Sequence, residues 1–138
     1  MAYSTISKPS LHFNTKLYTG NGSTNAITGV GFQPDWTWIK NRSANDGPHL
    51  YDAVRGVTKR LRSDTTAAEA TASYGLTTFG TDGFTVGTEG DVNTSSENFV
   101  AWNWKAGTGQ GSSNTDGSIN TTYTSVNTTA GFSITSWV

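Results

Sequence analysis

Two segments of this sequence share one pattern, a pair of tryptophans separated by a single residue. They are PDWTWIKNR at 34–42 and NFVAWNWKAG at 98–107, and they hold four of the chain's five tryptophans. Residues two apart lie on the same face of a β-strand, so each segment places two indoles on one side of a sheet. In the first segment Thr37 and Ile39 occupy the opposite face. A strand that is apolar on both faces is typical of the middle of a sheet.

The paired tryptophans have two interpretations, a sugar-binding surface or a core. A sugar-binding surface needs exposed rings with polar neighbours. The neighbours of the second pair on its own face are Val100 and Ala106, which are core residue types. The chain is also poor in Leu and Ile, so aromatic side chains have to supply much of its buried area. We therefore expect a structural core of Trp36, Trp38, Trp102, Trp104, Phe84 and Phe99.

The rest of the chain is a series of short segments separated by turn residues. Charged residues make up only 14% of the chain, and Thr, Ser, Asn and Gly replace them, which favours strands and tight turns. Asn21-Gly22 and Thr81-Asp82-Gly83 are hairpin signals. Residues 63–73 are the one segment that suits a short helix, with a loop as the alternative. The pattern predicts an all-β fold, an antiparallel two-sheet β-sandwich with little or no helix, with strands at 13–20, 26–32, 35–42, 49–56, 57–63, 74–80, 83–87, 98–107, 119–127 and 130–138.

The domain organisation predicted is simple. Residues 1–12 are an N-terminal arm or linker, and residues 13–138 are a single β-sandwich domain. Residues 107–118 are rich in Gly and Ser, so we expect a flexible connection there. The end of the chain, GFSITSWV, repeats the spacing of HFNTKLYT at 12–19. Residues 130–138 are therefore either an assembly strand or the start of a second repeat.

Bulk properties exclude several classes of function. The net charge of −1 predicts no attraction to nucleic acid or to an anionic membrane. The chain has no cysteine, so it has neither disulfides nor a thiolate metal site. No apolar run approaches the roughly 20 residues of a spanning helix, and the sequence MAYSTISKPSLHF does not resemble a signal peptide.

Catalytic chemistry has little support. The two histidines are far apart in the sequence, and no expected strand carries a pair of carboxylates. We therefore expect no catalytic residues, no cofactor and no metal. The alternative is a calcium site at Asp91 and Asn93, with Glu89 or Glu97 adding oxygen ligands.

Two charged motifs have a structural and a functional interpretation. Asp52 and Arg55 suit either a polar site or an ion pair that ties a turn to the sheet, and we favour the ion pair. The basic run Lys59-Arg60-Leu61-Arg62 suggests a phosphate site, but it lacks interleaved aromatics. A solvated strand face is the preferred interpretation.

Four motifs are spaced along the chain: GFQPDWTWIKNR at 31–42, YDAVRG at 51–56, DGFTVG at 82–87 and FVAWNWKAG at 99–107. Together they resemble a domain of structural and tail-fibre-like proteins of bacteriophages, particularly marine and cyanobacterial ones. The resemblance covers about residues 13–138 and implies a concanavalin A-like, lectin-type jelly roll. It also implies a virion surface protein that is made in the host cytoplasm and has no catalytic residues.

The function expected from this resemblance is a non-enzymatic virion module: a fibre, an appendage or a capsid decoration subunit. Its expected partners are copies of itself or other virion proteins, with contact to host surface glycans as a further role. The first alternative is a carbohydrate-binding, lectin-like adhesion module, for which the candidate residues are Trp137, Tyr51, Asn45 and Asp46. The weaker alternative is a polysaccharide-degrading enzyme.

Overall fold

The computed structural model describes residues 6–138, so residues 1–5 of the predicted arm lie outside the described residues. The predicted all-β fold of antiparallel strands is confirmed, because strands make up nearly all of the regular structure. No helix in the described part of the chain is long and apolar enough to cross a membrane. The strands are β1 (Phe13–Thr19), β2 (Asn25–Thr28), β3 (Trp36–Asn41), β4 (His49–Asp52), β5 (Lys59–Arg62), β6 (Ala70–Thr71), β7 (Leu76–Gly80), β8 (Gly83–Val86), β9 (Asn98–Trp104), β10 (Tyr123–Asn127) and β11 (Phe132–Ser136), and the helical turns are η1 (Pro9–Leu11) and α1 (Gly90–Asn93).

Six strands form the larger sheet, in the order β1-β9-β3-β4-β5-β6. β9 and β3 are neighbours in its middle, as the apolar character of both faces of 35–42 predicts. Their register places Trp104 opposite Trp36 and Trp102 opposite Trp38. The two W-x-W segments therefore lie side by side on one face of the sheet.

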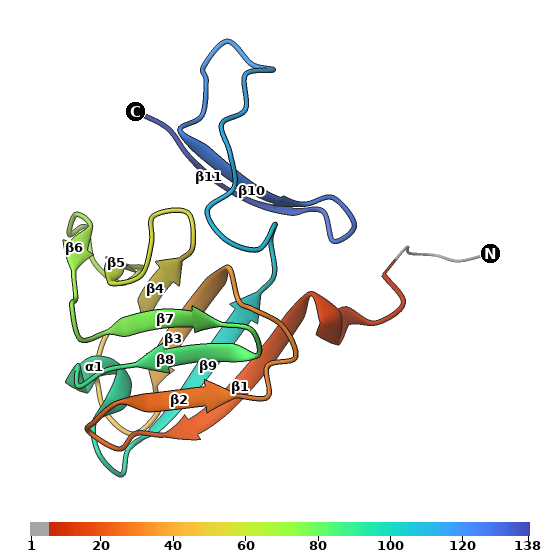
Figure 1. The fold of residues 1–138 in the computed structure, drawn as a ribbon. Coiled ribbons are helices and arrows are strands. Elements are labelled where there is room, and N and C mark those ends of the chain that lie inside the picture. Colours follow the sequence, from red (N-terminus) through yellow and green to blue (C-terminus); the bar gives the residue numbers. More distant parts are fainter. Residues whose placement is uncertain (1–5) are drawn as a thin grey trace.

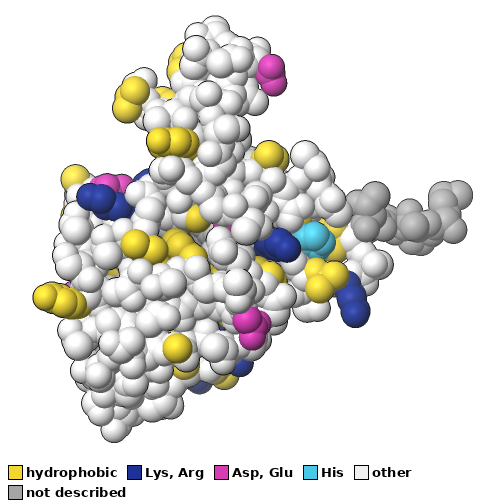
Figure 2. Space-filling model, viewed as in Figure 1, with side chains coloured by type: hydrophobic (Ala, Val, Ile, Leu, Met, Phe, Trp, Pro, Cys, Tyr) yellow, Lys and Arg dark blue, Asp and Glu magenta, His cyan; other side chains and the backbone are white. Residues whose placement is uncertain are grey.

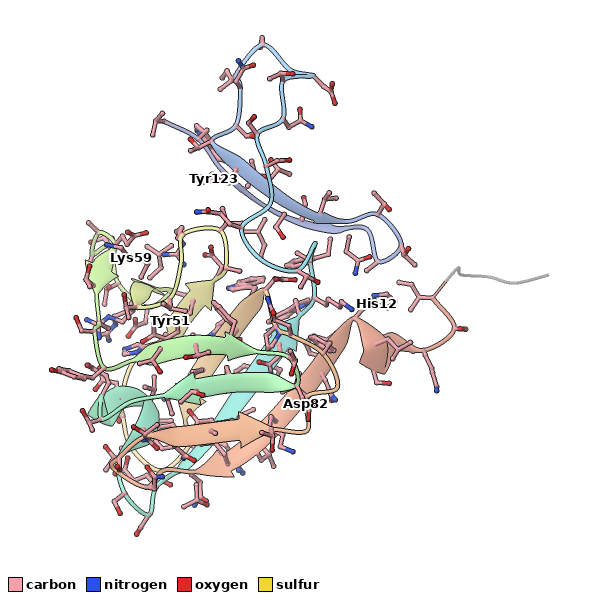
Figure 3. All side chains as sticks on the ribbon, viewed as in Figure 1. His12, Tyr51, Lys59, Asp82 and Tyr123 are labelled. Atoms are coloured by element: carbon pink, nitrogen blue, oxygen red, sulfur yellow. The ribbon has the colours of Figure 1, made fainter. Side chains whose placement is uncertain are left out.

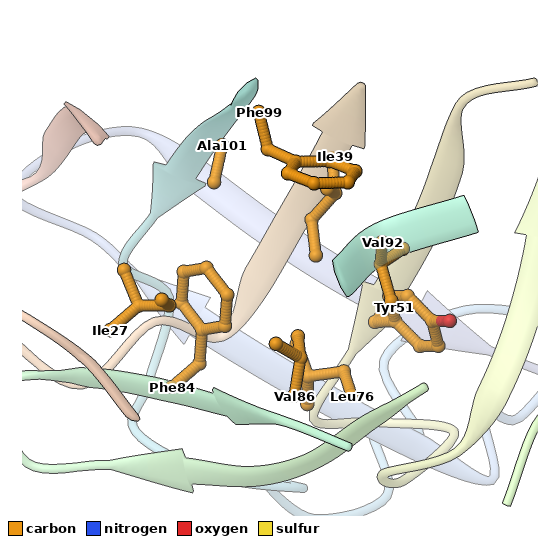
Figure 4. Packing of buried hydrophobic residues seen from close by; sticks show 9 residues of the cluster. All are labelled: Ile27, Ile39, Tyr51, Leu76, Phe84, Val86, Val92, Phe99 and Ala101. Atoms are coloured by element: carbon orange, nitrogen blue, oxygen red, sulfur yellow. The ribbon is translucent and has the colours of Figure 1, made fainter. Parts of the chain in front are cut away.

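Three strands form the second sheet, in the order β2-β8-β7, and this sheet covers the other face of the first (Figure 1). Alternate side chains of both sheets meet between them and make the hydrophobic core (Figure 4). The molecule is thus a two-sheet sandwich. The core residues are Ile27, Ile39, Tyr51, Leu76, Phe84, Val86, Val92, Phe99 and Ala101.

The strands β10 and β11 pair only with each other and form a hairpin that projects from one end of the sandwich (Figure 1). Hydrophobic side chains are visible on the surface of this projection (Figure 2). Asn127 anchors the hairpin to the sandwich through the Lys105 carbonyl at 3.2 Å and His12 Nδ1 at 3.1 Å. The Gly107 amide also donates to Ser125 Oγ at 3.0 Å. The Gly/Ser-rich segment therefore starts from a fixed point.

Two local expectations differ from the structure. Asn21-Gly22 does not close a hairpin, because β1 belongs to the six-stranded sheet and β2 to the three-stranded one. The turn instead carries the chain between sheets, with Gly22 at a φ of 67° that favours glycine. Residues 63–73 form a loop and β6 rather than a helix, and the α-helical turn is α1, inside the polar segment 88–97. The Thr81-Asp82 turn does join β7 to β8 as predicted.

Candidate functional site

The four paired tryptophans lie outside the core. Each is half-buried and points away from the three-stranded sheet, whereas Phe84 and Phe99 lie in the buried cluster. The prediction of a core position for these four tryptophans is therefore wrong. The inner positions of β3 and β9 are taken by Thr37, Ile39, Asn41, Phe99, Ala101 and Asn103, and strand alternation puts Trp36, Trp38, Trp102 and Trp104 on the opposite side. We call this side of the six-stranded sheet the outer aromatic face.

One end of the outer aromatic face is a continuous stack of rings. Phe13 lies 4.9 Å from Trp104, and Trp104 lies 4.6 Å from Trp36 with 26° between their planes. Phe132 of the hairpin lies parallel to Trp36, with 6.0 Å between ring centroids. Aromatic pairs of this kind contribute about 0.5–1.5 kcal/mol beyond the area they bury. The stack therefore helps to hold the hairpin on the sandwich.

The other end of the outer aromatic face is open. Trp38 and Trp102 meet edge to face at 5.8 Å, and with Trp104 they line a hollow of about 290 Å³. Beside them Leu17 is 59% exposed, and Leu61, which is 37% exposed, lies two strands away at the cleft under β11. Apolar patches this continuous are uncommon on a monomer unless they bind something.

A cleft of about 300 Å³ separates β11 from the sheet, and its lining includes Trp36, Asp52 and Arg55. Arg55 Nε lies 2.5 Å from Asp52 Oδ2, and Arg55 Nη1 lies 3.1 Å from Glu69. The Arg55 amide also donates to Asp52 Oδ1 at 2.8 Å. The interpretation of this motif as an ion pair that ties the turn to the sheet is confirmed.

The four predicted carbohydrate-binding residues do not come together. Tyr51 is fully buried in the core, between the two sheets (Figure 3), so it cannot contact a ligand and that prediction is wrong. Trp137 is 66% exposed and follows β11 on the hairpin. Asn45 and Asp46 lie in the loop after β3, at the end of that strand away from Phe132. The Lys40 ammonium donates to the Asp46 carbonyl at 2.7 Å, which holds this loop against the sheet.

A cluster of ionisable side chains lies between β4, β5 and α1. His49 is fully buried, with Nε2 3.1 Å from Asp91 and Nδ1 3.4 Å from the Tyr51 hydroxyl. Arg60 of the basic run lies 3.4 Å from Glu89 and is half-buried rather than fully solvated. Burial, aided by the Arg60 charge and opposed by Asp91, lowers the pKa of His49 to about 4. Burial also raises the pKa of Tyr51.

The suggested calcium ligands have other roles. Asp91 pairs with His49, and the buried Asn93 amide donates to Asn21 and to the Gly87 carbonyl. Within residues 6–138 no group of three or more His, Asp or Glu side chains is arranged to hold a metal ion. Asn93 instead fixes the loops that join the two sheets.

The sequence alone predicts that the four tryptophans share one face of the sheet. It does not predict whether that face packs against the second sheet. The alternation of tryptophans gives a single face, and Leu50 and Leu61 extend it, since they are partners across β4 and β5. Trp38 pairs with Leu50 in the same register. The face therefore spans several strands that are distant in sequence.

The chain belongs to a protein family described as a domain of unknown function, DUF7483, whose model matches residues 8–138. No curated protein matches the chain, and no solved structure matches it.

Proposed function

We propose that this domain is a non-enzymatic structural module of a bacteriophage virion, a fibre, appendage or decoration subunit that assembles with copies of itself. The contact surface is the outer aromatic face. One observation carries the proposal: Trp38, Trp102 and Trp104 line an open hollow, with exposed Leu17 beside it. Aromatic residues are enriched in the buried centres of protein interfaces, and Trp contributes most often to their affinity.

The ring stack supports self-assembly more directly. The hairpin already places Phe132 on Trp36, so this face accepts an aromatic side chain carried by a β-strand. Beside the hollow, the Lys40 ammonium donates to the Asn41 and Asp46 carbonyls at 2.7 Å each. These bonds already replace part of the hydration of that charge, so a second apolar surface that covers the tryptophans removes less water from it.

The virion setting rests on the sequence motifs alone. The pattern from Gly31 to Gly107 resembles phage structural proteins. The antiparallel six- and three-stranded sheets form a sandwich, which is the broader fold class of the implied jelly roll. The proposal of a non-enzymatic role is supported by His49 and Tyr51, whose side chains are buried and cannot reach a substrate.

The proposal is tested by measuring the mass of the full chain by light scattering over a concentration series. Thr15 is exposed on β1 and pairs with Trp102, so Thr15→Arg covers the hollow without removing a tryptophan. We expect assemblies for the wild-type chain and monomers for this variant. Thr78→Arg is the matched control, since Thr78 is exposed on the other sheet. A wild-type chain that stays monomeric throughout, or a Thr15→Arg variant that assembles normally, would refute the proposal.

A second candidate function is carbohydrate binding at the same hollow. Half-exposed indoles favour it, because ring faces pack on the apolar faces of sugars while nearby polar groups bind hydroxyls. It predicts that host polysaccharide quenches tryptophan fluorescence in the wild-type chain and not in Thr15→Arg. Flat titrations across a broad set of glycans count against it.

A further inference from the structure

The hairpin and the loop that leads into it carry further exposed apolar side chains. Ile119, in the loop before β10, is 68% exposed, Val126 on β10 is 49% exposed and Trp137, just after β11, is 66% exposed. By strand alternation Val126 and Trp137 lie on the hairpin face opposite Phe132. A two-stranded hairpin is at best marginally stable alone in water, so its stability depends on what it packs against. Here one side is supported by Phe132 on Trp36, and the other side carries the exposed Val126 and Trp137. We call these exposed residues the hairpin patch.

The open hollow continues the surface that the hairpin already uses. Trp104 lines the hollow and also lies 6.5 Å from Phe132. The covered part of the face therefore shows what kind of group suits the uncovered part, an aromatic ring presented by a hairpin. Trp137 is such a ring, and its exposure shows that it does not fill the hollow of its own copy.

We propose that Trp137 and the hairpin patch of one copy seat in the hollow lined by Trp38, Trp102 and Trp104 of a second copy of this chain. This inference rests on the proposed function and names its geometry. The two patches are different surfaces of the same chain, so each copy binds one neighbour through its hairpin and another through its hollow. Such heterologous contacts produce rings or filaments rather than closed two-fold dimers.

Charge does not oppose this contact. The hollow is lined by three tryptophans, and the whole chain carries a net charge of −1. Repulsion between copies is therefore small at physiological salt, where the screening length is about 8 Å. Burial of a tryptophan in an aromatic pocket is the typical centre of a protein interface.

The test uses the full chain and two variants that each disable one patch. Trp137→Ser removes the inserted ring, and Thr15→Arg covers the hollow. Each variant alone should be monomeric by light scattering. An equimolar mixture should form dimers and stop there, because the pair retains only one functional contact. Thr135→Ser, an exposed change on β11 that keeps Trp137, is the control and should assemble as the wild type does.

The outcomes separate this inference from the proposed function. If Trp137→Ser assembles normally and Thr15→Arg is monomeric, two aromatic faces pack directly together; the head-to-tail contact is then wrong and the proposed function stands. Failure of the mixture to form dimers also overturns the head-to-tail contact. If the wild-type chain is monomeric throughout, both proposals fail. Circular dichroism and the unfolding midpoint of each variant show that it is folded.

Discussion

We expect acidification from about pH 7 to about pH 4 to destabilise the fold through His49, because its imidazole is buried without solvent contact. The groups that face it are Asp91 at 3.1 Å, Arg60 at 3.5 Å and the Tyr51 hydroxyl at 3.4 Å. Arg62, its cross-strand partner on β5, adds a second positive charge. Glu89 lies beside Arg60 and partly neutralises it. The Asp91 carboxylate favours the imidazolium, but burial together with Arg60 outweighs it and lowers the pKa of His49.

The sign and size of the effect follow from this pKa. In the unfolded chain the imidazole has a pKa near 6.5, and in the folded chain its pKa is about 4. Above the unfolded value both states are neutral, and the stability does not depend on this group. Between the two values the unfolded state binds a proton that the folded state does not, so stability falls as the pH falls. At about 1.4 kcal/mol per pH unit, the loss is about 3 kcal/mol by pH 4.

The assay is urea unfolding at several pH values, followed by tryptophan fluorescence. The free energy of unfolding of the wild type should decline between about pH 6.5 and about pH 4. His49→Gln is the comparison, since it keeps a polar side chain there and cannot gain this proton. It should be less stable at neutral pH and should lose the decline. Hydrogen bonds from Arg62 lower the pKa of Asp64, and those from the Gly31 and Gly29 amides lower the pKa of Asp82. These carboxylates therefore take up protons, and affect the stability, at a lower pH than His49 does. A wild-type slope equal to that of His49→Gln would show that the reasoning is wrong.

Three further predictions concern stability. Phe99→Ala should cost about 3–5 kcal/mol in urea unfolding because Phe99 is fully buried, whereas Trp102→Ala should cost clearly less because Trp102 is half-buried on the outer face. Equal losses would place Trp102 in the core after all. Asp35→Asn should destabilise by roughly 2–3 kcal/mol, since the buried carboxylate accepts the Ala106, Thr108 and Gly109 amides at 2.7, 3.0 and 2.6 Å; an unchanged midpoint counts against this role. Phe132→Ala should speed amide exchange in β10 and β11 while β9 stays protected; unchanged exchange in the hairpin would show that the ring stack does not hold it.

The strands were predictable from the sequence because their periodicity is local. The alternation in 34–42 and 98–107 gives two strands, and the apolar character of both faces gives their central place in the sheet. Which face meets the second sheet was not predictable in the same way. Polar residues are normally assigned to solvent, yet Thr37, Asn41 and Asn103 are buried on the inner face. Thr37 Oγ1 donates to Asn103 Oδ1 at 3.1 Å, and this pairing offsets the cost of burial.

Contacts between distant segments explain the other differences. Asn21-Gly22 has the local signature of a hairpin, but Asn93, more than 70 residues later, receives the Gly22 amide on its carbonyl and the Asn21 amide on its side chain. Nothing near the turn reveals that partner. The helical turn α1 is likewise placed by long-range contacts: Val92 packs in the core, and its carbonyl accepts the Tyr18 hydroxyl at 2.7 Å.

The unequal sizes of the two sheets explain why the tryptophans serve two purposes. A three-stranded sheet covers the inner face of six strands, so aromatic side chains on the outer face must be covered by something else. The hairpin covers one end of that face through Phe132, and the stack from Phe13 to Trp36 becomes part of the fold. The other end, at Trp38 and Trp102, has no cover from the described residues. Tryptophans at the covered end therefore contribute to stability, and those at the open end are free to contribute to association, with Trp104 belonging to both.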